Sequence, residues 1–375
     1  MHWLARLALC APFLGCSSLG SSDTGLRGTL VIAGGGMSSR SLEVREAFLS
    51  RRVSGKVGVI GAASAEPDAS AKRGVRAMDE AAGAAVSIAL PFNEARPELA
   101  DDPEMVALIE GCGALWFTGG SQSRIIKAMR PDGSDSAAWL ACMDLLARGG
   151  VIGGSSAGAA MMSDPMIRRG RSADALVEGV GSEGVEVGLG MGFFPWGICG
   201  QHFLERGRFG RMVVALGETG RRFGWGVSED SALLVDRATG WVEVMGTSGL
   251  ALFDTESLKS STGRWDSVEL ALLSTGDRVH APTGEVEPAP SAAPRRRASL
   301  IGELVIEELW GPKALREACL YLARGDGGSA RLTAVDARAL LREGDETRAW
   351  RVEGDPPRER WSVHGLRLDV YRMTE

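Results

Sequence analysis

Hydrophobic and polar positions alternate in a regular way from about residue 28 onward. Short apolar runs, often β-branched and ending in glycine, are followed by longer amphipathic stretches. Short runs of this kind are typical of buried strands, and the amphipathic stretches are typical of helices packed on a sheet. Their alternation predicts an α/β fold with a mostly parallel sheet flanked by helices.

The pattern assigns individual elements up to about residue 152. The expected strands are 30–33, 57–60, 85–90, 114–117 and 151–152. The expected helices are 67–82, 103–110, 123–129 and 136–147. The last of these strands leads into the segment of the chain that carries the most chemical information.

The composition changes beyond residue 281, where four prolines lie among alanines, serines and three arginines. This is linker chemistry, and it predicts a linker over residues 284–298. The remaining residues, 299–375, form a small C-terminal extension in which 312–323 and 334–341 are expected to be helical and 350–352 and 366–371 to be strands. Its length is compatible with an accessory or dimerisation role, so a homodimer is one expectation.

The first residues have the pattern of an export signal. A basic start is followed by an apolar run over residues 7–14, which is too short to span a bilayer. The run ends in Gly15-Cys16, as in a bacterial lipobox, so we predict a signal peptide at 1–15, lipidation of Cys16 and a Ser/Gly-rich tether at 16–27. An ordinary secretory signal is the alternative.

Charge and cysteine usage exclude several classes of function. The formal net charge of −6 disfavours a polyanionic partner such as nucleic acid. Arginine is nevertheless dense around residues 168–171 and 206–211, which leaves room for a local anionic ligand. No Cys/His metal pattern is present, so no metal is predicted. Four widely spaced cysteines are expected to be buried free thiols, although one disulfide remains an alternative: Cys112, Cys142, Cys199 and Cys319.

Residues 153–159 (GGSSAGA) contain G-x-S-x-G between an expected strand and an expected helix. A tight strand-to-helix turn lifts a serine hydroxyl clear of the backbone only if small residues flank it. The candidate nucleophile is Ser156, and the N–H of Ala157 then points at a developing oxyanion. Phosphate binding is the rival interpretation of such a turn, but the second glycine spacing of a dinucleotide site is absent.

A serine nucleophile needs a base, and histidine supplies one with a pKa near neutrality. The chain has four histidines, of which only His202 lies inside the α/β body near the end of an apolar run. A carboxylate must then orient the imidazole. Glu229 is the first candidate and Asp230 the second, because both lie between two apolar runs. A structural histidine and an exposed turn are the alternatives.

A further glycine pair ends the strand expected at 114–117, in residues 117–122 (FTGGSQ). Ligands gather at the carboxyl ends of parallel strands, and a glycine there allows close backbone approach. Gly120 is therefore a candidate for a second oxyanion N–H, with a plain turn as the alternative.

Taken together, four ordered motifs resemble the cyanophycinases, which are related to dipeptidase E among the serine peptidases. The motifs lie at residues 117–122, 154–159, 201–203 and 229–230, and the resemblance covers about residues 28–283. It implies a class I glutamine amidotransferase-like fold, a flavodoxin-like three-layer sandwich, with no cofactor. It also implies hydrolysis of peptides that contain aspartate, often as a β-linked Asp-Arg unit.

The resemblance carries the roles of nucleophile, base and acid partner to Ser156, His202 and Glu229. Its substrate-pocket positions correspond to Gln122, Gln201, Arg206, Arg208 and Arg211, where basic groups would bind substrate carboxylates. A solvated arginine face is the alternative for these arginines.

The sequence departs from the family at one position. The family commonly has aspartate directly before Gln-His-Phe, whereas this chain has Gly200. Recognition of a substrate arginine is therefore in doubt, and Asp174 is a candidate for a substitute carboxylate in the pocket or for the acid of the triad.

Three hypotheses follow from the sequence. The first is an exported, lipid-anchored, cyanophycinase-like serine peptidase acting on aspartyl or isoaspartyl peptides through an acyl-enzyme. The second is a dipeptidase E-like exopeptidase for Asp-X dipeptides. The third is a non-catalytic lipoprotein that binds peptides in the same pocket.

Overall fold

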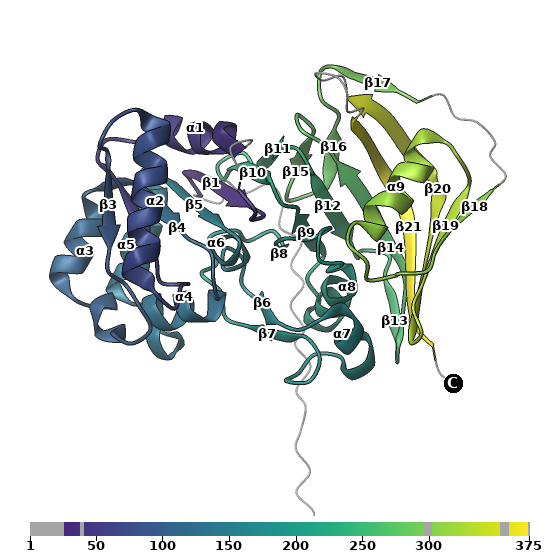
Figure 1. Cartoon of the computed structure of the whole chain (residues 1–375), viewed down its shortest axis with the longest axis horizontal. Helices are drawn as coiled ribbons and strands as arrows, with labels where there is room; N and C mark the ends of the chain where they lie inside the picture. Colours follow the sequence, from purple (N-terminus) through teal and green to yellow (C-terminus); the bar gives the residue numbers. More distant parts are fainter. Residues whose placement is uncertain (1–25, 38–40, 296–301, 353–359, 374–375) are drawn as a thin grey trace, which may run out of the picture.

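The computed structural model describes residues 26–37, 41–295, 302–352 and 360–373 (Figure 1). The predicted signal peptide and the lipidation site Cys16 lie outside the described residues. Within the described part of the chain, no helix is both long and apolar enough to cross a membrane.

A nine-stranded sheet forms one half of the molecule. Five neighbouring strands at one edge of this sheet are parallel. The strand order there is β1-β5-β4-β2-β3. These strands are β1 (Thr29–Ala33), β2 (Lys56–Ile60), β3 (Ser87–Leu90), β4 (Cys112–Phe117) and β5 (Val151–Ser155). The helices between them are α1 (Leu42–Ser50), α2 (Pro67–Ala82), α3 (Pro103–Glu110), α4 (Gln122–Met129) and α5 (Ala137–Ala147). All the strands and helices expected before residue 152 are present at or near their expected bounds.

The other part of the same sheet is antiparallel, so the prediction of a mostly parallel sheet is wrong. Strand β10 (Ser231–Asp236) pairs antiparallel with β1, and β11 (Trp241–Gly246), β15 (Arg278–His280) and β16 (Glu285–Glu287) continue the sheet. For the β10–β11 pair the reason is chain length, because parallel neighbours need a crossover of a dozen or more residues. Only residues 237–240 separate β10 from β11, and a turn of that length forces an antiparallel pair.

A second sheet of ten strands forms the other half of the molecule (Figure 1). Its main order is β18-β19-β20-β21-β14-β12-β9-β8, with β13 and β17 paired at its sides. The strands from the body are β8 (Ile198–Gly200), β9 (Phe223–Val227), β12 (Leu250–Asp254), β13 (Lys259–Ser261) and β14 (Arg264–Leu273). Those from the last part of the chain are β17 (Ala292–Pro294), β18 (Glu303–Ile306), β19 (Ser329–Thr333), β20 (Ala337–Val352) and β21 (Arg360–Arg372).

The C-terminal residues are therefore continuous with the body through the pairing of β21 with β14. Helices α8 (Phe209–Thr219) and α9 (Ala314–Arg324) pack into one apolar cluster on this sheet. The helix expected at 312–323 and the two expected C-terminal strands are present. The amidotransferase-like, three-layer description implied by the resemblance stays a prediction.

Two expectations for the last part of the chain fail. Residues 334–341 were expected to be helical, but β20 begins at Ala337 and pairs with both β19 and β21. Alanine, leucine and arginine favour helices locally, and pairing on both sides overrides that preference. The segment 284–298, expected to be a linker, contains β16 and β17, which pair with β15 and β20.

Candidate active site

Ser156 lies on a sharp turn between β5 and the short helix α6 (Ala157–Ala160). Its φ of 57° and ψ of −109° are rare for a residue with a side chain. The turn is possible only because Gly154 and Gly158 have no side chains that would collide with neighbouring backbone atoms. A Cβ atom at Gly154 would lie 2.4 Å from the carbonyl oxygen of Gly158, and one at Gly158 would lie 2.4 Å from that of Phe117.

Ser156, His202 and Glu229 form a continuous hydrogen-bonded chain. The Oγ of Ser156 is 2.8 Å from Nε2 of His202, and Nδ1 of His202 is 2.6 Å from Oε1 of Glu229. A carboxylate can only accept, so Nδ1–H donates to Glu229 and leaves Nε2 free to accept the serine proton. This arrangement can deprotonate a hydroxyl as it attacks a carbonyl.

The second candidate acid has a different partner. The carboxylate of Asp230 accepts a hydrogen bond from Oγ of Ser41 at 2.7 Å, and its backbone N–H donates to the carbonyl of Gly35. Asp174 lies in helix α7 (Ser172–Glu178), where it lines a pocket rather than contacting the histidine. Of the three carboxylates considered from the sequence, only Glu229 contacts His202.

The glycine segment after β1 holds the histidine and its acid in place, a role that the sequence analysis missed. The backbone N–H of His202 donates to the carbonyl of Gly34 at 2.8 Å. A Cβ atom at Gly35 would lie 2.3 Å from the imidazole, and one at Gly36 would lie 2.9 Å from the carboxylate of Glu229. The run of three glycines was the available signal, because adjacent glycines mark close approach by another group.

The environment of His202 favours the neutral imidazole. Burial lowers its pKa below the ordinary value of 6.5, and the positive charges of Arg206 and Arg208 lower it further. The hydrogen bond to Glu229 raises the pKa but does not outweigh burial. A neutral imidazole is the form that can accept a proton.

Two backbone N–H groups beside Ser156 are available for an oxyanion. Within the described part of the chain, neither Ala157 nor Gly120 donates its N–H to another protein group. Gly120 needs its glycine, since its φ is 147° and a Cβ would lie 2.2 Å from the carbonyl oxygen of Ala63. Its neighbour Gly119 approaches the serine closely, because a Cβ atom there would lie 3.2 Å from Cβ of Ser156.

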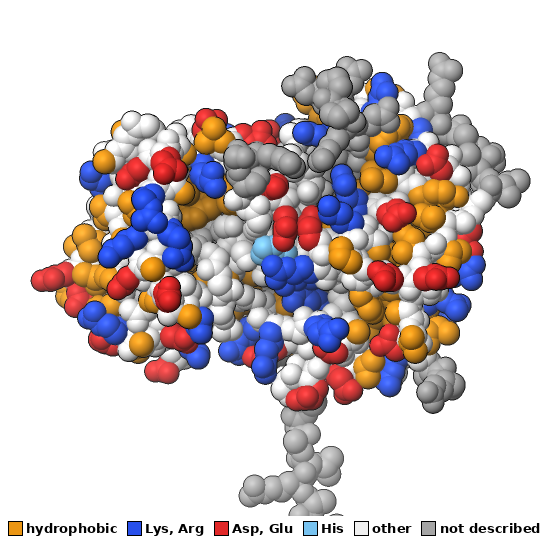
Figure 2. Space-filling model, viewed as in Figure 1, with side chains coloured by type: hydrophobic (Ala, Val, Ile, Leu, Met, Phe, Trp, Pro, Cys, Tyr) orange, Lys and Arg blue, Asp and Glu red, His pale blue; other side chains and the backbone are white. Residues whose placement is uncertain are grey.

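A cavity of about 380 Å³ opens beside Ser156. Its lining includes six arginines and two acidic residues: Arg168, Arg169, Arg171, Arg206, Arg208, Arg211, Asp174 and Glu183. Figure 2 shows blue side chains gathered next to the pale blue histidine in the hollowed centre of this face. A cavity lined in this way attracts anionic groups.

The pocket brings together two arginine clusters that are distant in the sequence. One comes from the loop and helix after β8, and the other from β6 (Met166–Arg169), which pairs with β7 (Glu186–Gly188). The sequence analysis noted the local density of arginine at 168–171 but did not assign it to this pocket. Glu186 pairs with two members of the second cluster, Arg168 at 2.7 Å and Arg169 at 2.5 Å.

The first cluster is crowded, with Arg211 buried, Arg208 half-buried and Arg206 exposed. Burial and the neighbouring arginines lower the pKa of Arg208 to about 10 and that of Arg211 to about 9. Arg208 donates to the backbone and side-chain oxygens of Gln201, and Arg211 donates to the carbonyl of Gly170 at 3.0 Å. A bound anion would relieve the repulsion between these cations.

Gln122 also lines this cavity, but its amide is bonded to the backbone of the neighbouring strand β6. Its Nε2 donates to the carbonyls of Ile167 and Arg168 at 2.7 and 2.8 Å. The amide therefore holds strand β6, and with it the second arginine cluster, against the end of β4 where α4 begins.

Gly200 does not line the cavity beside Ser156. It is buried in β8, and a Cβ atom there would lie 2.9 Å from both Met212 and the ring of Phe203. A side chain at this position would point into the apolar cluster, so the expectation that an aspartate at 200 would supply the pocket with a carboxylate does not fit this chain.

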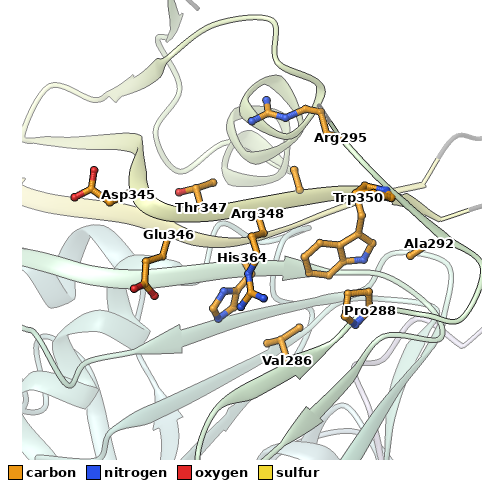
Figure 3. Close-up of a pocket in the computed structure, with 12 residues that line it drawn as sticks. Val286, Pro288, Ala292, Arg295, Asp345, Glu346, Thr347, Arg348, Trp350 and His364 are labelled. Carbon is orange, nitrogen blue, oxygen red and sulfur yellow. The ribbon is translucent and has the colours of Figure 1, made fainter. Parts of the chain in front are cut away.

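A larger cavity, of about 730 Å³, lies away from the triad between β16, β17 and the long β20–β21 hairpin. Figure 3 shows Trp350 and Pro288 on its apolar side and Glu346, Arg348 and His364 at its other end. Among the described residues, including those of this cavity, no three His, Cys, Asp or Glu side chains are placed to hold a metal ion. The four cysteines in the described part of the chain are free and buried, as expected.

Comparison with known proteins extends these observations. Cyanophycinases from Nostoc sp. (strain PCC 7120) and Trichormus variabilis (strain ATCC 29413) are each 30% identical over 276 residues, which cover 69% of this chain and 87% of the relative. No family model matches the chain. A peptidase from an acI-B1 actinobacterium shares the fold, with a TM-score of 0.51 at 18% identity over 68% of this chain and 98% of that one. The chain belongs to the cyanophycinase family.

Proposed function

We propose that this protein is a serine peptidase that hydrolyses aspartyl or isoaspartyl peptides through an acyl-enzyme. The observation that carries the proposal is the chain of hydrogen bonds from Ser156 through His202 to Glu229. Family membership supports a peptidase, and an assembled triad disfavours a protein that only binds peptides.

The proposed reaction has two halves. In the first, Oγ of Ser156 attacks the scissile carbonyl carbon while its proton passes to Nε2 of His202, and the N–H groups of Ala157 and Gly120 stabilise the oxyanion. The C–N bond then breaks, and the imidazolium returns the proton to the leaving amine. In the second half, His202 takes a proton from water as the water attacks the ester carbonyl. The C–O bond to Ser156 then breaks, and the imidazolium returns the proton to Oγ as the acid is released.

The arginine pocket supports an aspartate as the acyl residue. A carboxylate of that residue not engaged in the scissile bond would meet the guanidinium groups of Arg206, Arg208 and Arg211. Both aspartyl and β-linked isoaspartyl residues carry such a carboxylate. The second candidate, an exopeptidase for Asp-X dipeptides in the manner of dipeptidase E, uses the same triad and differs only in the length of the accepted chain.

A substrate panel tests the proposal. We expect purified enzyme to hydrolyse β-Asp-Arg polymer, β-Asp dipeptides or Asp-X dipeptides, and Ser156→Ala to lose this activity by several orders of magnitude with its thermal unfolding unchanged. Cleavage of dipeptides alone would favour the exopeptidase. Comparable hydrolysis by Ser156→Ala would remove Ser156 from the mechanism, and no hydrolysis by the wild type would leave a binding protein.

We also propose that the protein is exported and anchored to the membrane through a lipid on Cys16. The sequence before the tether supports this, because an apolar run ends in a small residue followed by cysteine. Mass spectrometry of the mature protein should find Cys16 as a diacylated N-terminus. A mature chain that begins elsewhere would contradict the anchor.

A further inference from the structure

The loop that carries the first arginine cluster is packed against the C-terminal part of the chain. Trp310 lies between β18 and α9, and its ring centroid is 5.0 Å from that of Phe209, at an interplanar angle of 40°. Phe209 is the first residue of α8 and sits between Arg208 and Arg211 in the sequence. The indole therefore contacts the backbone segment from which these arginines project.

Two glycines allow the contact to be this close. A Cβ atom at Gly207 would lie 2.3 Å from the carbonyl oxygen of Trp310, and one at Gly210 would lie 2.7 Å from its ring. The positive φ of Gly207, 53°, adds a second reason for glycine there. The sequence thus alternates arginines that face the pocket with glycines and a phenylalanine that face Trp310.

A hydrogen bond and an apolar cluster fasten the same contact. The backbone N–H of Lys313 donates to the carbonyl of Leu204 at 2.7 Å. Leu204 and Phe209 share one buried cluster with Leu309 and with the inner face of α9. The Nε1–H of Trp310 is buried and has no hydrogen-bond partner among the described residues, so the indole acts here through its shape.

The arginines need such a constraint because they repel one another. Neighbouring positive charges help to lower the pKa of both Arg208 and Arg211. Free loops relieve repulsion by moving apart, whereas this loop is held by contacts with both Trp310 and Ser172. Oγ of Ser172 donates to the carbonyl of Gly207 at 2.7 Å and accepts from the N–H of Arg211 at 3.2 Å.

We propose that Trp310 is a positioning residue through which the C-terminal segment sets the arginine loop for substrate binding. The kinetic part of this inference rests on the proposed function. The triad has further anchors outside this loop, because His202 is held by Gly34 and Ser156 beside the nine-stranded sheet and by Glu229 after β9. Loss of Trp310 therefore acts on the affinity for the carboxylate more than on the chemical step.

Kinetics give the first test. For Trp310→Ala we expect KM for an aspartyl or isoaspartyl peptide to rise about tenfold to a hundredfold, which corresponds to one lost charge-assisted hydrogen bond, with kcat within about threefold of wild type. Trp310→Phe should restore part of the affinity, because it keeps an aromatic ring for Phe209 but lacks the outer indole ring that lies against Gly210. If Trp310→Ala does not fold, Trp310→Leu takes its place, and the same rise in KM is expected.

A matched control separates positioning from general loss of stability. Trp350 is buried, at 5% exposure, and lies in β20 of the same C-terminal segment, but its indole donates to Asp277 beside the larger cavity (Figure 3). Trp350→Ala should lower the melting temperature while leaving KM close to wild type. An equal rise of KM in both variants would overturn the proposal.

A second readout does not depend on the substrate. Phenylglyoxal modifies accessible arginines, and Arg211 is only 6% exposed. Mass spectrometry should find Arg208 and Arg211 modified several times faster in Trp310→Ala than in wild type or Trp350→Ala. Unchanged labelling in Trp310→Ala would overturn the proposal even in an active enzyme. Faster labelling in a protein that hydrolyses none of the peptides would reject the proposed function and leave the positioning role standing.

Discussion

Replacement of Gly35 by alanine should inactivate the enzyme without unfolding it. The new Cβ would lie 2.3 Å from Cε1 of His202, whereas ordinary contacts of a Cβ are 3.4 Å or longer. The imidazole must therefore retreat by about 1 Å, and misplacement of a catalytic group on that scale costs about a hundredfold in rate. The 2.8 Å hydrogen bond from Ser156 would lengthen beyond the range in which proton transfer is efficient.

The backbone also contributes a penalty, and a control can isolate it. The φ of Gly35 is 109°, a conformation that costs a residue with a side chain about 1–3 kcal/mol. Gly149 has a φ of 87° with open space around its Cβ position. Gly149→Ala therefore carries a similar backbone strain without the contact to the imidazole.

The assay compares both variants by kcat/KM on the best peptide of the panel and by the rate at which a fluorophosphonate labels Ser156. Both variants should lose some thermal stability, but only Gly35→Ala should lose about a hundredfold in kcat/KM and in labelling rate. The reasoning is refuted if Gly35→Ala retains the activity and labelling rate of Gly149→Ala.

Two further predictions concern charge. Arg206→Gln should move the acid limb of the kcat/KM profile to higher pH, because the positive charge of Arg206 helps to lower the pKa of His202 and the base works only when neutral; a shift to lower pH would contradict this. Gly200→Asp should lower the free energy of unfolding by about 2–5 kcal/mol in denaturant, since the carboxyl group would be buried against Met212 and Phe203. The same substitution should not raise the preference of the enzyme for β-Asp-Arg over β-Asp-Leu. A stable variant with increased arginine selectivity would show that the side chain reaches the pocket.

The elements that could be predicted from the sequence are those whose pattern is local. Helices α2 and α3 have the expected bounds, because a proline at the first helical position starts each one and glycine follows the last residue. Strand β20 could not be predicted in this way, since its residues favour a helix and its conformation depends on partners in β19 and β21. The antiparallel half of the nine-stranded sheet was missed because the pattern shows strands but not their neighbours.

In the candidate site, too, the features set by local sequence could be predicted, and those set by contacts between distant residues could not. The turn around Ser156 is encoded by adjacent small residues, so the motif could be found directly. The contact of Gly35 with His202 joins positions far apart in the chain, and only the folded structure brings them together. The two arginine clusters were visible as local densities, but no local pattern places both of them on one cavity.

The triad is assembled across the two sheets, and this explains why the glycine segment matters. Ser156 follows β5 of the nine-stranded sheet, whereas His202 follows β8 and Glu229 follows β9 of the ten-stranded sheet. The 2.8 Å distance between Oγ of Ser156 and Nε2 of His202 therefore depends on the relative position of the two sheets. The backbone of residues 34–36 crosses that junction, and its carbonyls accept from the N–H groups of His202 and Asp230. One apolar cluster joins strands of both sheets, so the sheets stay packed together when a single glycine of this segment is replaced. Such a substitution acts locally at the junction and can shift the base relative to the nucleophile.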